Sequence, residues 1–205
     1  MVSKTLVLGI GTGRCGTLSL CDFLRHQPEM YCTTEAVKIP WYYEDEITEK
    51  SDPIFLWIKS DKKIVGDVGS YTLPHVRKIA KLFDDVRLLV VQRDKQATIK
   101  SWMKKTHEKH NYWVPHTLGI WKDDLYDPFF PTFKDMERKT KQEAISVYYD
   151  FYYDECKKLK SDFKTLWFKT EDSEKIETRK QILEFCGFDK SKWKLNVKCR
   201  RNSIP

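Results

Sequence analysis

Short apolar segments alternate with amphipathic ones along this chain. Residues 5–10 form a short, continuous apolar run, which is typical of a strand buried on both faces of a parallel sheet. Further strands are predicted over residues 30–33, 63–66, 87–92 and 165–168. Between them, apolar residues recur at helical spacing, as in Leu20, Phe23 and Leu24. The alternation predicts an α/β fold over residues 1–205, a single domain whose central, mostly parallel sheet has helices on both faces.

Two helices are predicted in the C-terminal third. Ile145, Tyr148, Tyr152 and Leu159 fall on one face of the first and form its apolar stripe. The second helix is bracketed by a capping-box pattern and a helix stop, at Thr178, Gln181 and Gly187. The capping box predicts that this last helix begins at Thr178.

Residues 102–138 have a different texture. They are rich in Trp, Tyr, Phe, His and Pro and show weak periodicity, which predicts a long excursion over the ligand-binding edge of the sheet. The excursion is a candidate lid over an acceptor, and its aromatic side chains fit a core or a dimer contact equally well.

Composition places the chain among soluble globular proteins. Hydrophobic residues make up 40% and charged residues 33% of its 205 residues, and no apolar run approaches the length of a membrane span. The first ten residues run into a glycine-rich segment instead of a small-residue cleavage site, so they do not match a signal peptide. We therefore expect a cytoplasmic protein.

The basic excess of the chain is mild. The formal net charge is +7, and most lysines are dispersed through helical segments, so the charge favours an anionic ligand without predicting nucleic acid. Basic residues cluster only at Lys198, Arg200 and Arg201. The six cysteines show no C-x-x-C pair and no nearby histidine spacing, which predicts free thiols and neither a metal site nor a disulfide framework.

A glycine-rich loop connects the first predicted strand to the first predicted helix. It comprises Gly11, Thr12, Gly13, Arg14, Cys15, Gly16, Thr17, Leu18 and Ser19. The amides of such a loop and the N-terminus of the helix converge on one point. They predict an anion site, with phosphate as its natural ligand.

Two phosphate-binding motifs overlap with this loop. Its spacing satisfies G-x-G-x-x-G, and Glu35 lies near the position of a ribose-binding acid, so an NAD(P)-binding oxidoreductase stays open. A P-loop nucleoside triphosphatase fits less well, because Thr17 and Leu18 follow the last glycine where a Lys and a Ser or Thr are required. A non-catalytic nucleotide-binding protein is a further alternative.

The same loop resembles the 5′-phosphosulfate loop of the sulfotransferases that use 3′-phosphoadenosine-5′-phosphosulfate (PAPS). In that family a Lys or Arg takes the position of Arg14 and is followed by Ser-Gly-Thr-Thr. Cys15 and Leu18 depart from this pattern, which removes two hydroxyl donors and leaves the backbone amides in place. The resemblance implies that residues 11–19 bind the 5′-phosphosulfate of PAPS.

A second part of the resemblance follows the fourth predicted strand. Arg93 leaves that strand, and Ser101 follows eight residues later, about two turns into the next predicted helix. The pair resembles the family's 3′-phosphate motif, and residues 63–101 are similar to the family's sequence leading to it. By resemblance, Arg93 and Ser101 bind the 3′-phosphate, and the basic tail with Arg200 and Arg201 takes the place of the family's C-terminal phosphate-contacting loop.

The resemblance implies an enzyme that moves a sulfuryl group from PAPS to a hydroxyl or amine by in-line displacement, without a metal. Arg14 is assigned to the charge that develops on the leaving 5′-phosphate. Glu35 resembles the base carboxylate of tyrosylprotein and some carbohydrate sulfotransferases, and Asp67, also at a strand end, is a second candidate base. The acceptor stays open among small molecules, carbohydrates and peptides, and so does the oligomeric state.

Overall fold

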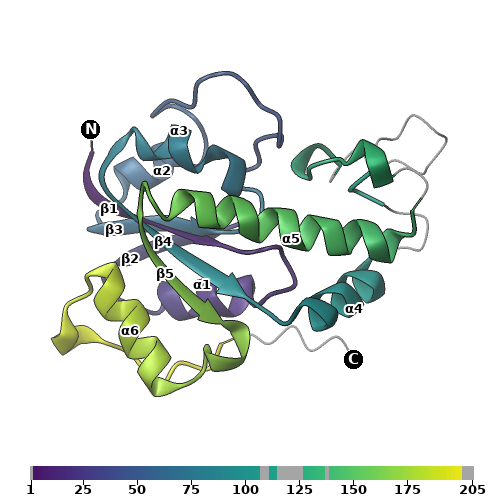
Figure 1. The fold of residues 1–205 in the computed structure, drawn as a ribbon. Helices are drawn as coiled ribbons and strands as arrows, with labels where there is room; N and C mark the ends of the chain where they lie inside the picture. The colour runs from purple at the N-terminus through teal and green to yellow at the C-terminus, as the bar shows by residue number, and fades with distance from the viewer. Residues whose placement is uncertain (1, 107–110, 115–126, 137–138, 200–205) are drawn as a thin grey trace.

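The apolar segments form one parallel sheet in the computed structural model of the chain, which describes residues 2–106, 111–114, 127–136 and 139–199 (Figure 1). The strands are β1 (Val2–Ile10), β2 (Met30–Thr34), β3 (Ile64–Val68), β4 (Phe83–Gln92) and β5 (Lys164–Lys169). Across these described residues the strand order is β2-β3-β1-β4-β5, and every neighbouring pair is parallel. The predicted α/β fold with a mostly parallel sheet is confirmed.

Helices cover both faces of the sheet. They are α1 (Thr17–Arg25), α2 (Ile54–Lys59), α3 (Val76–Ala80), α4 (Lys95–Lys105), α5 (Lys141–Leu159) and α6 (Ile176–Cys186). α1 and α6 lie against one face, and α2, α3 and α5 against the other (Figure 1). Leu6 and Leu8 of β1 pack on the α5 side and Val7 packs with α1 and α6, which is why this strand is apolar in successive residues. Within the described ranges, no helix combines the length and the apolar character needed to cross a membrane.

The two ends of α6 agree differently with the sequence prediction. Gly187 ends the helix in a left-handed conformation with φ 79°, as predicted. The predicted start is wrong, because the helix begins two residues earlier with Lys175 as its N-cap, and Thr178 is buried in the first turn. A complete capping box occurs instead at the start of α5, where the side chains of Thr140 and Glu143 cap each other's backbone amides.

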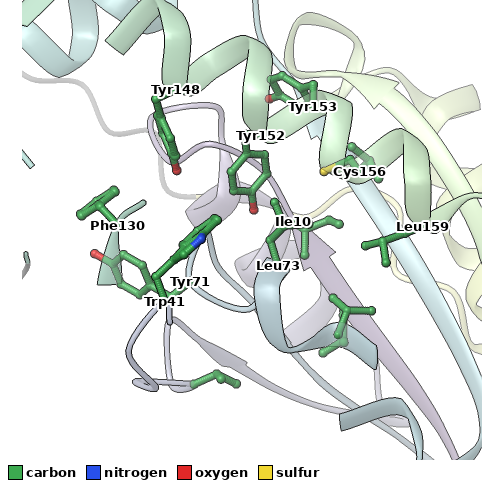
Figure 2. Close-up of a cluster of buried hydrophobic side chains, with 14 of the residues drawn as sticks. Ile10, Trp41, Tyr71, Leu73, Phe130, Tyr148, Tyr152, Tyr153, Cys156 and Leu159 are labelled. Carbon is green, nitrogen blue, oxygen red and sulfur yellow. The ribbon is translucent and has the colours of Figure 1, made fainter. Parts of the chain in front are cut away.

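Part of the aromatic excursion at residues 102–138 belongs to the core. Trp102, Tyr112, Trp113 and Phe130 are all more than nine-tenths buried. The rings of Tyr112 and Phe130 stack with centroids 5.0 Å apart, and Phe130 also packs edge to face on a tyrosine of α5 (Figure 2). Residues 107–110, 115–126 and 137–138 of the excursion lie outside the described residues, so its role as a lid stays a prediction.

Candidate active site

A cavity of about 910 Å³ lies where the strands end. Each strand is followed by residues that line it: Gly13 and Arg14 after β1, Glu35 after β2, Tyr71 after β3, Arg93 after β4 and Thr170 after β5. Parallel α/β sheets bind ligands at the carboxyl ends of their strands, where the strand order reverses. β1 lies at the centre of this sheet, so its glycine loop occupies the middle of the binding edge.

The glycine loop turns sharply before α1. Gly13, Arg14 and Gly16 have left-handed backbones, with φ of 73°, 56° and 93°, and Gly16 is the N-cap of α1. A Cβ on Gly13 would lie 2.7 Å from a ring carbon of Trp102, so only glycine fits there. Arg14 adopts this conformation without that freedom, which marks a strained position. The turn presents the loop and the N-terminus of α1 to the cavity, the arrangement of an anion site.

The predicted cofactor-binding loop divides into two sets of residues. Those that line the cavity are Gly13, Arg14, Gly16, Thr17, Leu18 and Ser19. The Gly11 amide instead donates to the Tyr152 hydroxyl at 3.1 Å, and Thr12 and Cys15 are fully buried. Burial raises the pKa of the Cys15 thiol to about 11, so the thiol is a neutral core group. The departure from the family pattern at Cys15 therefore removes no hydroxyl donor from the cavity.

Residues assigned from the sequence to two different phosphates meet at this cavity. Arg14 Nε donates to Ser101 Oγ at 3.1 Å, and Arg93 Nη1 donates to the Arg14 carbonyl at 3.1 Å. Asp94 caps α4, the helix that carries Ser101, by accepting from the Ala97 amide at 2.8 Å. Burial, and after it the charge of Arg93, lowers the pKa of Arg14. Two guanidinium groups held this close to each other favour a shared anionic ligand.

Glu35 is a carboxylate that reaches the cavity. Its backbone is left-handed, with φ 48°, and its amide donates to the Val68 carbonyl at 3.1 Å, so the chain turns directly after β2. Burial is the main cause that raises the pKa of Glu35; the charge of Asp67 raises it further, and that of Arg14 lowers it. A carboxyl group with a raised pKa beside a cationic loop is suited to exchange a proton with a bound substrate.

Asp67, the second candidate base, lies behind the cavity wall. It is fully buried and is not among the residues that line the cavity. Its carboxylate accepts from the Thr33 hydroxyl at 2.7 Å, the Ala36 amide at 3.2 Å and the Thr72 hydroxyl at 3.3 Å. Burial raises the pKa of Asp67, and these hydrogen bonds oppose that rise. The bond to Ala36 ties Asp67 to the turn that carries Glu35, so its place is that of a support for this turn.

The segment after β5 adds a wall in which the sequence prediction had assigned no ligand-binding residue. Its lining residues are Thr170, Glu171, Ser173 and Glu174. The Thr170 hydroxyl donates to the Cys15 carbonyl, which joins this wall to the glycine loop. Their position after the strand predicted at residues 165–168 is a signal that could have indicated them.

Two further predictions concern the tail and metal binding. Arg200 and Arg201 lie outside the described residues. Among the residues that the structure does describe, no three His, Cys, Asp or Glu side chains are placed to hold a metal ion together.

No protein-family model and no curated protein matches this sequence. Several solved structures match the fold of the chain. A sulfotransferase from Alicyclobacillus acidocaldarius aligns with a TM-score of 0.56 and 12% identity, and the alignment covers 97% of this chain and 87% of that sulfotransferase. The sulfotransferase domain from the curacin biosynthetic pathway aligns with 92% of this chain and 76% of its own, with a TM-score of 0.58 and 9% identity. A mouse sulfotransferase complexed with PAP aligns with 92% of this chain and 60% of its own, with a TM-score of 0.51 and 14% identity.

Proposed function

Because the chain has the sulfotransferase fold, we propose that it transfers a sulfuryl group from PAPS to a hydroxyl or amine acceptor. The observation that carries the proposal is the meeting of Arg14, Arg93 and Ser101 at one cavity. These residues come from the ends of β1 and β4 and from α4, and they are the residues that the family resemblance assigns to the two phosphate groups of PAPS. PAP, which is adenosine 3′,5′-bisphosphate, is the nucleotide that PAPS leaves after transfer, and it is bound in one of the solved structures with this fold.

The cavity residues suggest how the reaction would proceed. A bond forms between the acceptor atom and sulfur while the bond from sulfur to the bridging oxygen of the 5′-phosphate breaks. Arg14 stabilises the negative charge that develops on that phosphate. Glu35 takes the proton that the acceptor loses. The transferred group carries one negative charge, so we expect cationic side chains to suffice without a metal ion.

The strand order argues against the dinucleotide-binding alternative. In a Rossmann sheet the second strand lies beside the first, in the order 3-2-1-4-5-6. Here β3 separates β1 from β2, and Glu35 follows β2. The strand that precedes the acid is therefore not the neighbour of the strand that precedes the glycine loop.

We predict that adenosine 3′,5′-bisphosphate stabilises the protein without added Mg²⁺. At about 100 times its Kd a ligand adds about 2.7 kcal/mol to the free energy of unfolding. For a chain of this size that gain raises Tm by about 5–10 °C. Differential scanning fluorimetry with the bisphosphate, ATP and NADH measures the shift, and a shift with NADH alone would contradict the proposal. Transfer of labelled sulfate from PAPS to an acceptor library then separates an enzyme from a non-catalytic binding protein.

A second prediction assigns the 3′-phosphate. Arg93→Ala and Ser101→Ala are expected to weaken binding of adenosine 3′,5′-bisphosphate by about 10-fold or more, because each removes a hydrogen bond to a charged group. Binding of adenosine 5′-monophosphate should change much less. Isothermal titration calorimetry with both nucleotides measures the difference. Lys100→Ala is the matched control: it removes a charge from the exposed side of α4, so it should leave both affinities unchanged. Equal losses for both nucleotides in Arg93→Ala would refute the assignment.

A further inference from the structure

Four tyrosine hydroxyl groups of α5 bond to the backbone at the ends of the strands. They belong to Tyr148, Tyr149, Tyr152 and Tyr153, and their distances to the accepting carbonyl oxygens run from 2.6 to 3.2 Å. A carbonyl oxygen can only accept, so each hydroxyl is the donor in its bond. The helical spacing of four residues puts Tyr148 and Tyr152 in one row and Tyr149 and Tyr153 in the next.

The first row holds the glycine loop. The Tyr152 hydroxyl accepts from the Gly11 amide at 3.1 Å and donates to the Ser70 carbonyl at 3.1 Å, so it joins the chain after β1 to the chain after β3. The Tyr148 hydroxyl donates to the Thr12 carbonyl at 3.2 Å. Figure 2 shows Tyr148 and Tyr152 projecting from α5. Burial raises the pKa of both phenols, so they keep the protons that these bonds need.

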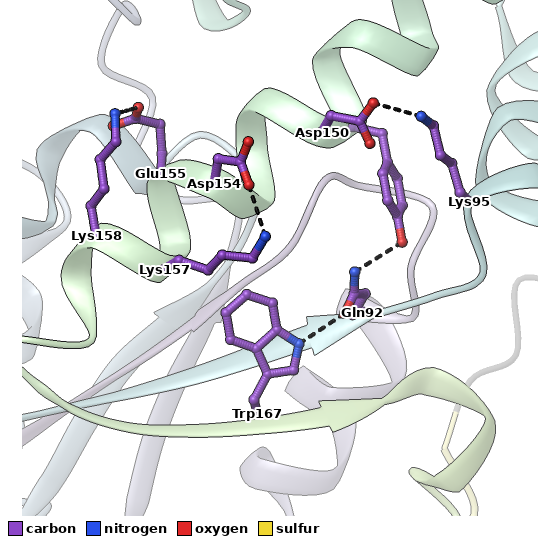
Figure 3. A network of polar contacts seen from close by, with 9 residues as sticks. Gln92, Lys95, Asp150, Asp154, Glu155, Lys157, Lys158 and Trp167 are labelled. Carbon is purple, nitrogen blue, oxygen red and sulfur yellow. Dashed lines mark hydrogen bonds and ion pairs between the residues drawn. The ribbon is translucent and has the colours of Figure 1, made fainter.

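The second row holds the strand end that carries Arg93. The Tyr149 hydroxyl donates to the Arg93 carbonyl at 2.6 Å and accepts from the Gln92 side-chain amide at 3.1 Å. The side-chain oxygen of Gln92, Oε1, in turn accepts from Trp167 Nε1 at 3.0 Å, a bond drawn between the two labelled residues in Figure 3. Because the indole N–H can only donate, this chain orients the glutamine amide toward Tyr149 and the tyrosine proton toward Arg93. Side chains from α5 and β5 thus hold the backbone of Arg93.

We infer that Tyr148, Tyr149 and Tyr152 of α5 are positioning residues, which set the glycine loop and Arg93 at the separation that one 3′,5′-bisphosphate nucleotide requires. The inference rests on the proposed function. One rigid helix holds both phosphate-binding segments, the loop through Tyr148 and Tyr152 and the arginine through Tyr149. Each anchor therefore affects a different phosphate, although none of these four tyrosines is among the residues that line the cavity.

The test is the affinity of each variant for two nucleotides, measured by isothermal titration calorimetry. Tyr149→Phe is expected to lower the preference for adenosine 3′,5′-bisphosphate over adenosine 5′-monophosphate by about fivefold, because Arg93 is assigned to the 3′-phosphate. Tyr152→Phe is expected to weaken the binding of both nucleotides by about fivefold and to leave the preference between them unchanged. Tyr42→Phe is the matched control: its hydroxyl accepts from the Thr132 amide at 3.0 Å and neither residue lines the cavity, so its loss should change neither affinity.

The preference between the nucleotides separates positioning from a merely structural role, which would lower Tm alone. An unchanged preference in Tyr149→Phe overturns the inference, and so does the same change in all three variants. Trp167→Phe breaks the same chain at its far end and is expected to lower the preference in the same direction, which supplies a reading if Tyr149→Phe does not fold. Wild-type protein that binds both nucleotides equally would contradict the proposed function itself, whereas a preference that is insensitive to Tyr149 overturns only the positioning role.

Discussion

Arg14→Ala is expected to lower kcat by about 10²- to 10³-fold on every acceptor. In the proposed reaction the guanidinium acts on the leaving phosphate, where charge develops in the same way whatever group attacks the sulfur. Alanine keeps a Cβ, so the left-handed backbone at φ 56° is similarly strained in both proteins, and the loss reports the guanidinium. Initial rates with labelled PAPS and an alcohol, a phenol and an amine measure kcat and KM for each acceptor.

A matched arginine variant controls for the loss of charge. Arg77 pairs with Asp162 at 2.7 Å on the surface, and Arg77→Ala should leave kcat unchanged. A loss in Arg14→Ala that is confined to one acceptor would contradict the assigned role. A rise in KM for PAPS with kcat unchanged would also contradict it, because such a result means that Arg14 binds substrate and transition state equally.

Glu35→Gln is expected to lower kcat by about 10²-fold or more on an alcohol and much less on a phenol. Glutamine keeps the shape and a hydrogen bond but cannot accept a proton. An alcohol needs that proton removed as it attacks, whereas a phenol is already partly ionised at high pH. Both acceptors are compared with saturating PAPS across the pH range.

The pH profile gives an independent reading of Glu35. The carboxyl group must be ionised to act as a base, and burial raises its pKa. The alcohol rate should therefore fall as the pH drops through a pKa above the ordinary value of a glutamate side chain. The Glu35→Gln variant should lack this decline, since glutamine does not titrate.

Asp67→Asn separates the two carboxylates. Asparagine keeps an oxygen to accept from Thr33 and Ala36, and the Thr72 hydroxyl can turn to accept from the new amide. We expect a modest loss of Tm and no preference between alcohol and phenol. If Asp67→Asn shows the selective loss instead, or if Glu35→Gln slows both acceptors equally, Glu35 is not the base.

Local patterns in the sequence determined the strands and the glycine loop, and the family resemblance singled out Arg93 and Ser101. Each observed strand overlaps a predicted one, and β1, which is buried on both faces, is apolar in successive residues. The loop was predictable because its left-handed turn uses glycine at Gly13 and Gly16. Arg93 and Ser101 both line the cavity, since one lies at a strand end and the other about two turns into the next helix.

Only the tertiary structure decided which way the side chains of these segments face. Arg14 and Cys15 are neighbours, yet one reaches the cavity and the other is fully buried, because the left-handed turn sends them to opposite sides. Glu35 directly follows β2, and Asp67 lies at the end of β3. Asp67 is buried behind hydrogen bonds from Thr33, Ala36 and Thr72, whereas Glu35 reaches the cavity.

The tyrosines of α5 show the same division. In the sequence, Tyr148 and Tyr152 belong to an apolar helical stripe, and their rings are indeed core. Their hydroxyl groups become anchors for the glycine loop only because α5 packs across the ends of β1, β3 and β4. A helical period determines which face of a helix is buried, but the backbone groups that the Tyr148 and Tyr152 hydroxyls reach lie more than 80 residues away in the chain.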